Sequence, residues 1–169
     1  MLDRMILESS TAKLRQYSSR IQDCLGKLTY QQIWTRGGES QNSIGNLVLH
    51  LCGNLRQWIG YGMAGMPDIR ARDQEFATRE GIQAEELRER LDTAVKEACG
   101  ILENLPAGRL RERIVVQKYD VTILAGILHV VNHFAEHTGQ IIFMTKLLTG
   151  ADLGFYKHLP QPAHGEKTP

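Results

Sequence analysis

The sequence has no excess of charge of either sign. Among 169 residues, Lys and Arg number 20 and Asp and Glu number 19, which leaves a formal net charge of +1. The basic residues are interspersed with acidic ones, so the sequence carries no electrostatic footprint for nucleic acid. The densest basic stretch, residues 109–113, is interpreted as a solvated connector. We therefore expect no nucleic-acid partner.

Cysteines and long apolar runs are also scarce. The three cysteines, Cys24, Cys52 and Cys99, are far apart and set among apolar residues, which excludes a disulfide framework and a Cys-x-x-Cys motif. No apolar run approaches the roughly 20 residues that span a bilayer. Residues 1–4 lead directly into an amphipathic pattern without the apolar region of a signal peptide. We expect a soluble cytoplasmic protein without a membrane partner.

Helical periodicity is what the sequence does contain. Apolar residues recur at spacings of three and four in four segments, expected to run from the N-terminus to about Gly26, from Asn42 or Ser43 to before Gly65, from Gln83 to about Leu105, and from Asp120 or Thr122 to Gly150. The length suits one domain. The sequence predicts an all-α four-helix bundle over residues 1–158, followed by a flexible tail over residues 159–169.

The connections between these segments are long for a simple up-and-down bundle, so at least one crossover is expected. Residues 67–81 are charged and only weakly periodic, which predicts a surface crossover with about one helical turn. Within it, Phe76 is expected to pin the crossover to the bundle rather than to touch a ligand. Residues 114–116 are β-branched and expected to be extended, but no paired strands are predicted.

Two histidines in the last segment are spaced so that both can bind the same metal ion. His133 and His137 are four residues apart, so on a helix they differ by 40° and lie one turn above each other. They belong to a seam expected to face the core, which consists of Gly126, Val130, His133, His137, Gln140, Met144 and Leu147. A buried imidazole needs a hydrogen bond, an ionic partner or a metal. Spacing alone leaves a hydrogen-bonded core pair and a metal-binding pair as alternatives.

A third ligand is expected from the second segment, where His50 lies at the edge of the apolar face. Three neutral imidazoles suit zinc, nickel, copper or iron, and three protein ligands leave one coordination position open, as in catalytic sites.

Four further residues are weaker candidates near the site. His129 could pair with His133 instead, and Glu136 is a weak candidate for a catalytic general base. Asn54 and Gln140 could orient ligands or waters, or be amides satisfied by other helices.

Two motifs, at residues 42–58 (NSIGNLVLHLCGNLRQW) and 129–141 (HVVNHFAEHTGQI), resemble the DinB/YfiT-like superfamily of metal-dependent enzymes. The likeness extends to residues 72–76 and 146–156. It implies a four-helix bundle with one nickel or zinc ion held by three histidines, matched here by His50, His133 and His137, often in a homodimer.

The resemblance also bears on activity. The superfamily includes transferases and isomerases that use the thiols bacillithiol, mycothiol or glutathione. Many relatives have a basic residue or histidine where Thr138 stands, and some have histidine where Glu136 stands. The substrates of these relatives therefore cannot be assigned to this chain. We expect a metal-dependent hydrolase or thiol (S-)transferase acting on a small molecule, and keep as the alternative a non-catalytic, metal- or small-ligand-binding dimeric scaffold.

Overall fold

All four periodic segments are helices in the computed structural model, which describes residues 2–157. The long helices are α1 (Leu2–Leu25), α3 (Ile44–Leu55), α6 (Ala84–Asn104) and α7 (Ile123–Thr149). A π-helical segment, η1 (Arg56–Tyr61), and α4 (Gly62–Ala64) continue α3. The shorter elements are α2 (Tyr30–Trp34), α5 (Arg72–Ala77), the 3-10 helix η2 (Ala107–Arg111), β1 (Arg113–Val116) and β2 (Tyr119–Thr122). The tail predicted at residues 159–169 lies outside the described residues.

The helix ends follow local capping chemistry. Of the alternatives left by the sequence, Ser43 caps α3 and forms a reciprocal capping box with Asn46, and the Thr122 side chain caps α7. Gly65 and Gly150 end their helices in the left-handed conformation that glycine adopts at no steric cost.

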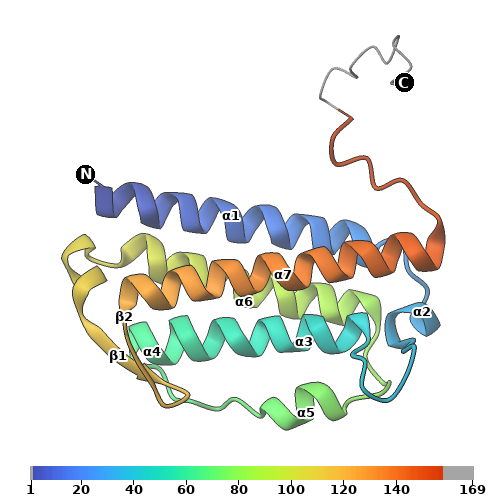
Figure 1. Ribbon diagram of the computed structural model, residues 1–169, viewed down its shortest axis with the longest axis horizontal. Helices are drawn as coiled ribbons and strands as arrows, with labels where there is room; N and C mark the ends of the chain where they lie inside the picture. The colour runs from blue at the N-terminus through green and yellow to red at the C-terminus, as the bar shows by residue number, and fades with distance from the viewer. Residues whose placement is uncertain (1, 158–169) are drawn as a thin grey trace, which may run out of the picture.

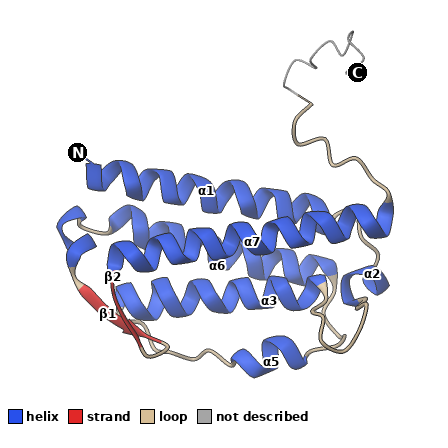
Figure 2. Ribbon diagram, in the orientation of Figure 1, coloured by secondary structure: helices blue, strands red, loops and turns tan. Residues whose placement is uncertain are grey.

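The topology is a bundle with one long crossover. Helix α1 packs against α6 and α7, and α3 packs against the same two helices. Figure 1 shows α1 and α7 running from left to right while α3 and α6 run from right to left. The connection from α4 to α6 therefore returns along the bundle, and it carries α5 (Figure 2). The predicted all-α bundle with a crossover is confirmed, and α3 and α7 are antiparallel neighbours.

One connector contains paired strands, so the prediction of no strand pair was wrong. Strands β1 and β2 form an antiparallel hairpin with Val116 opposite Tyr119. The intervening Gln117 and Lys118 have φ of 50° and 70°, values at which glycine and asparagine are the usual signals of a two-residue turn. Neither is present, so the turn left no trace in the sequence.

The core-facing side of α7 is rotated from the predicted seam. The residues of α7 that are buried are Ile123, Gly126, Ile127, Val130, Phe134, Thr138, Ile141 and Thr145. Gln140 is exposed and Leu147 is 72% exposed, which corrects the seam. Thr138 and Thr145 can face the core because their hydroxyls donate to the carbonyls of Phe134 and Ile141. As a result, His133 and His137 lie half-buried at the rim of the core.

Within residues 2–157, none of the helices combines the length and the apolar character that crossing a membrane requires.

Candidate metal centre

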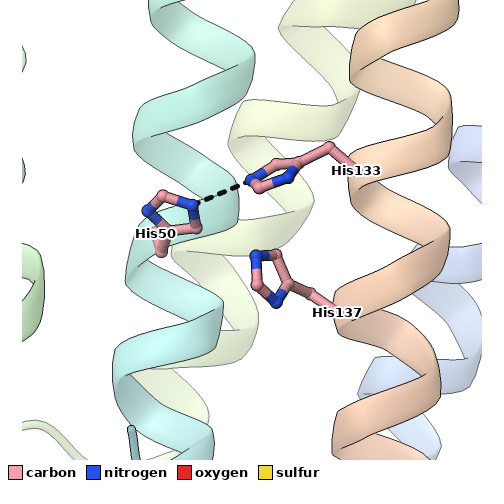
Figure 3. A group of neighbouring side chains, drawn as sticks. All are labelled: His50, His133 and His137. Carbon is pink, nitrogen blue, oxygen red and sulfur yellow. Dashed lines mark hydrogen bonds between the residues drawn. The ribbon is translucent and has the colours of Figure 1, made fainter. Parts of the chain in front are cut away.

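Three histidines from two helices meet at one point. His50 projects from α3, and His133 and His137 project from α7 toward it (Figure 3). One ring nitrogen from each lies within 4.8 Å of the other two. The Nε2 atoms of His50 and His133 are 2.8 Å apart. The antiparallel packing of α3 against α7 thus brings together the three residues that the sequence singled out.

The geometry fits a divalent ion bound to three nitrogens. With bonds of about 2.0–2.1 Å, two imidazole nitrogens on a tetrahedral ion lie about 3.3 Å apart. The observed 2.8 Å between two of them, and the limit of 4.8 Å for all three, bracket that separation. The fit also holds chemically, because two nitrogen lone pairs at 2.8 Å repel each other unless a proton or a cation lies between them.

The histidines of α7 are held in their neutral forms. Burial first, and then His137, His50, His129 and Arg70, lower the pKa of His133 to about 3. Burial also lowers the pKa of His137, against an opposing hydrogen bond to Gln140. Neutral imidazole is the form that binds metals. Near pH 7 neither ring has to lose a proton to become a ligand.

Each end of the cluster is oriented by a further side chain. Nδ1 of His137 lies 2.8 Å from Oε1 of Gln140. An amide oxygen can only accept, so this contact places the ring proton on Nδ1 and leaves Nε2 free for an ion. At the other end, Nδ1 of His50 lies 3.0 Å from Oε2 of Glu75 and 3.0 Å from Nη2 of Arg70.

Glu75 and Arg70 form a buried ion pair on the crossover. Arg70 donates from Nε to Oε1 and from Nη2 to Oε2 of Glu75, both at 2.8 Å. The side chain of Arg70 is only 3% exposed and that of Glu75 only 10%. Burial by itself raises the pKa of Glu75, but hydrogen bonds to Arg70 and His50 outweigh it, so the net pKa is lowered. An ionised carboxylate therefore lies against His50.

Sequence reasoning missed this pair. Residues 67–81 were recognised as a crossover, but no spacing rule connects a charged loop to a histidine on a helix some 20 residues earlier. Phe76 joins the crossover to the bundle at the site itself, since its ring centroid lies 4.7 Å from that of His50 on α3. The expected joining of the crossover to the bundle is thus made through a residue of the candidate site.

The remaining candidates lie outside the cluster. His129 is exposed, with its ring centroid 4.4 Å from that of Trp58 and 5.6 Å from that of His133. Glu136 is exposed, and its charge raises the pKa of His129 and His137 against the effect of burial. Asn54 is buried, but within residues 2–157 no hydrogen bond joins it to the three histidines.

The fold and the cluster together define a DinB-like helical bundle with a three-histidine site compatible with metal binding. Two solved structures share the fold. A conserved protein from Enterococcus faecalis aligns with a TM-score of 0.74 and 16% identity over 85% of this chain and 97% of its own. The DinB-like protein YjoA from Bacillus subtilis aligns with a TM-score of 0.67 and 17% identity over 88% and 97%.

The chain belongs to the family described as protein of unknown function (DUF1572), which matches residues 2–160. No curated protein matches the chain. The family match and the shared fold are consistent with the resemblance to the DinB/YfiT-like superfamily.

Proposed function

We propose that this protein binds one divalent metal ion, nickel or zinc, through His50, His133 and His137. The observation that supports this most directly is the convergence of three ring nitrogens within 4.8 Å of one another. The lowered pKa values on α7 and the contacts of Glu75 and Gln140 with the outer ring nitrogens support it further.

We further propose a metal-dependent hydrolase or thiol (S-)transferase acting on a small molecule. An ion held by three protein ligands would leave one coordination position open, where a water or a thiol would lose its proton more readily and so be available as a nucleophile. His50 anchors the site from the inside, because its side chain is only 7% exposed. His133 and His137 are half-buried, which leaves an outside group access to the cluster. Exposed Glu136 is the weak candidate for a base at this rim.

The alternative function is a non-catalytic metal-binding scaffold. The chain's own thiols favour it, because Cys24, Cys52 and Cys99 are all buried. Burial raises the pKa of Cys52 to about 12, so this thiol is not a nucleophile at neutral pH. Glu75 is likewise occupied by Arg70 and His50. Catalysis would then depend on a thiol or a water brought from outside.

Metal binding is tested by metal analysis and Ni²⁺ titration of the wild type, His137→Ala and the matched variant His129→Ala. We expect one ion per wild-type chain. Loss of residues outside the ligand sphere typically weakens binding by about 10–100-fold, so loss of the ligand in His137→Ala should weaken it by more than about 100-fold. His129→Ala should bind as the wild type does.

A wild type that binds no divalent ion, or equal affinities for the two variants, would refute the proposed site. A thiol-transfer and esterase screen of the metal-loaded protein then separates the enzyme from the scaffold. Activity that His137→Ala lacks supports the enzyme, and metal without turnover supports the scaffold.

A further inference from the structure

The crossover reaches the histidine cluster from the side away from α7. We propose that Glu75, held in place by Arg70, is a positioning residue for the metal ligand His50, and that metal binding and docking of the crossover onto α3 stabilise each other. The inference rests on the proposed metal site and adds to it a segment distant from the ligands in sequence.

The first step concerns which groups can donate a hydrogen bond to Nδ1 of His50 and which can accept one from it. An imidazole that binds an ion through Nε2 keeps its proton on Nδ1, and that proton needs an acceptor. Oε2 of Glu75, at 3.0 Å, is such an acceptor. Nη2 of Arg70, also at 3.0 Å, can only donate. Glu75 therefore favours the form of His50 that binds metal, while Arg70 alone would favour the form that carries its proton on Nε2.

The second step is how α3 accommodates the pair. A Cβ atom at Gly53 would lie 1.9 Å from Oε1 of Glu75 and 3.0 Å from Nε of Arg70. The carboxylate can therefore reach His50 only because residue 53 has no side chain. Asn46, a turn before His50, donates from Nδ2 to the carbonyls of Glu75 and Thr78 at 2.7 and 2.8 Å. One face of α3 thus carries the ligand and also fixes the backbone that presents Glu75.

The third step is linkage. If the docked crossover increases the affinity of the site for metal by some factor, metal must increase the docking equilibrium by the same factor. The crossover has few buried apolar anchors, since the two apolar residues of α5 are half-buried Phe76 and exposed Ala77. Its docking is therefore expected to respond measurably to the ion.

The test is Ni²⁺ titration of the wild type, Glu75→Ala, the double variant Glu75→Ala/Arg70→Met, and Asp73→Asn as the matched control. Asp73 is an exposed acid on the same short helix. Thermal unfolding monitored by circular dichroism verifies that each variant is folded. Amide hydrogen exchange of residues 68–78 is measured with and without Ni²⁺.

We expect Asp73→Asn to bind Ni²⁺ as the wild type does and Glu75→Ala to bind about 10–100-fold more weakly. The double variant should recover part of this loss, because it removes the donor that opposes the metal-binding form of His50. If Glu75 had a purely structural role, the Ni²⁺ affinities of the two variants would change only in step with their thermal stabilities, which the unfolding measurements report. Ni²⁺ should slow exchange in residues 68–78 of the wild type and have a smaller effect in Glu75→Ala.

The inference is overturned if the wild type binds Ni²⁺ and Glu75→Ala binds it equally well, or if the metal leaves exchange of the crossover unchanged. Should Glu75→Ala fail to fold, the double variant, which leaves no buried unpaired charge, decides by its affinity. Binding weaker than that of Asp73→Asn supports the inference, and equal binding overturns it. Failure of the wild type to bind Ni²⁺ instead refutes the proposed function itself.

Discussion

Gly53 lies where the backbone of α3 and the Arg70–Glu75 ion pair come closest, so its replacement by alanine tests the packing of the crossover directly. In an unobstructed helix, Gly→Ala stabilises by about 1 kcal/mol, since glycine loses more backbone entropy on folding. Gly100, inside α6, provides the matched case, because a Cβ atom there meets nothing within 4 Å. Gly100→Ala should therefore gain up to about 1 kcal/mol of unfolding free energy.

At Gly53 the same methyl group has no room. It would lie 1.9 Å from Oε1 and 2.8 Å from Cδ of Glu75. The carboxylate is at the end of a flexible side chain and can swing out, but this leaves Arg70, with a side chain only 3% exposed, without its partner. Removing one member of a buried ion pair costs about 3–5 kcal/mol. Arg70 and Glu75 can move in part together, so we take the lower value of this range, about 3 kcal/mol. Subtracting the stabilisation of about 1 kcal/mol that alanine gives a helix leaves a net loss of about 2 kcal/mol in unfolding free energy.

Urea unfolding of both variants measures the difference. Gly53→Ala should shift the midpoint to lower urea and Gly100→Ala to higher urea, with a gap of about 3 kcal/mol in unfolding free energy. Equal stability of the two variants would refute the close contact of Glu75 with α3. It would also remove the structural basis for a carboxylate that orients His50.

Two further predictions concern pH and the anchoring of the crossover. Since burial and neighbouring groups lower the pKa of His133 to about 3 and also lower that of His137, the unfolded chain binds more protons than the folded one below pH 6.5, the ordinary histidine value. The Tm of metal-free protein should therefore fall as the pH drops from about 6.5 toward 4. The fall should be less steep in His133→Asn. A Tm independent of pH in this range would contradict the lowered pKa values of the two histidines. Asn46, which is 0% exposed, binds two crossover carbonyls, so Asn46→Ala should cost about 3 kcal/mol in urea unfolding and speed proteolysis within residues 65–83. Unchanged stability and cleavage would show that these hydrogen bonds do not anchor the crossover.

The parts of the molecule that the sequence predicts are those with local causes. Helical periodicity located the four long helices, and capping chemistry narrowed their ends to residues such as Ser43 and Thr122. The i, i+4 spacing of His133 and His137 on one helix placed both beside the same point in space. His50 could be added because a bundle brings facing helices together.

The parts that the sequence did not predict depend on contacts between distant segments or on side-chain choices without a unique pattern. The rotation of α7 follows from Thr138 and Thr145, which are polar by type but satisfied by the helix's own carbonyls. The pairing of Glu75 with His50 depends on the path of the crossover, which no periodicity fixes. The π-helical segment η1 was likewise not predicted. It contributes Gln57, whose side-chain oxygen accepts a hydrogen bond from Arg70 at 3.0 Å.

Several features around His50 lower stability when each is considered separately. Gly53 weakens the helix that carries His50, and a buried ion pair is often no more stable than apolar residues of the same volume. A π-helical turn follows directly, and such turns are frequent at functional sites. These features all act on one ring, because Gly53 admits Glu75, Arg70 holds it, and Gln57 of the π-helical turn holds Arg70. A stable bundle requires none of them, whereas a ligand that must keep one nitrogen directed at an ion requires an orienting acceptor. The convergence of these costs on the ring of His50 is therefore an argument for a metal centre that does not depend on the distances between the histidines.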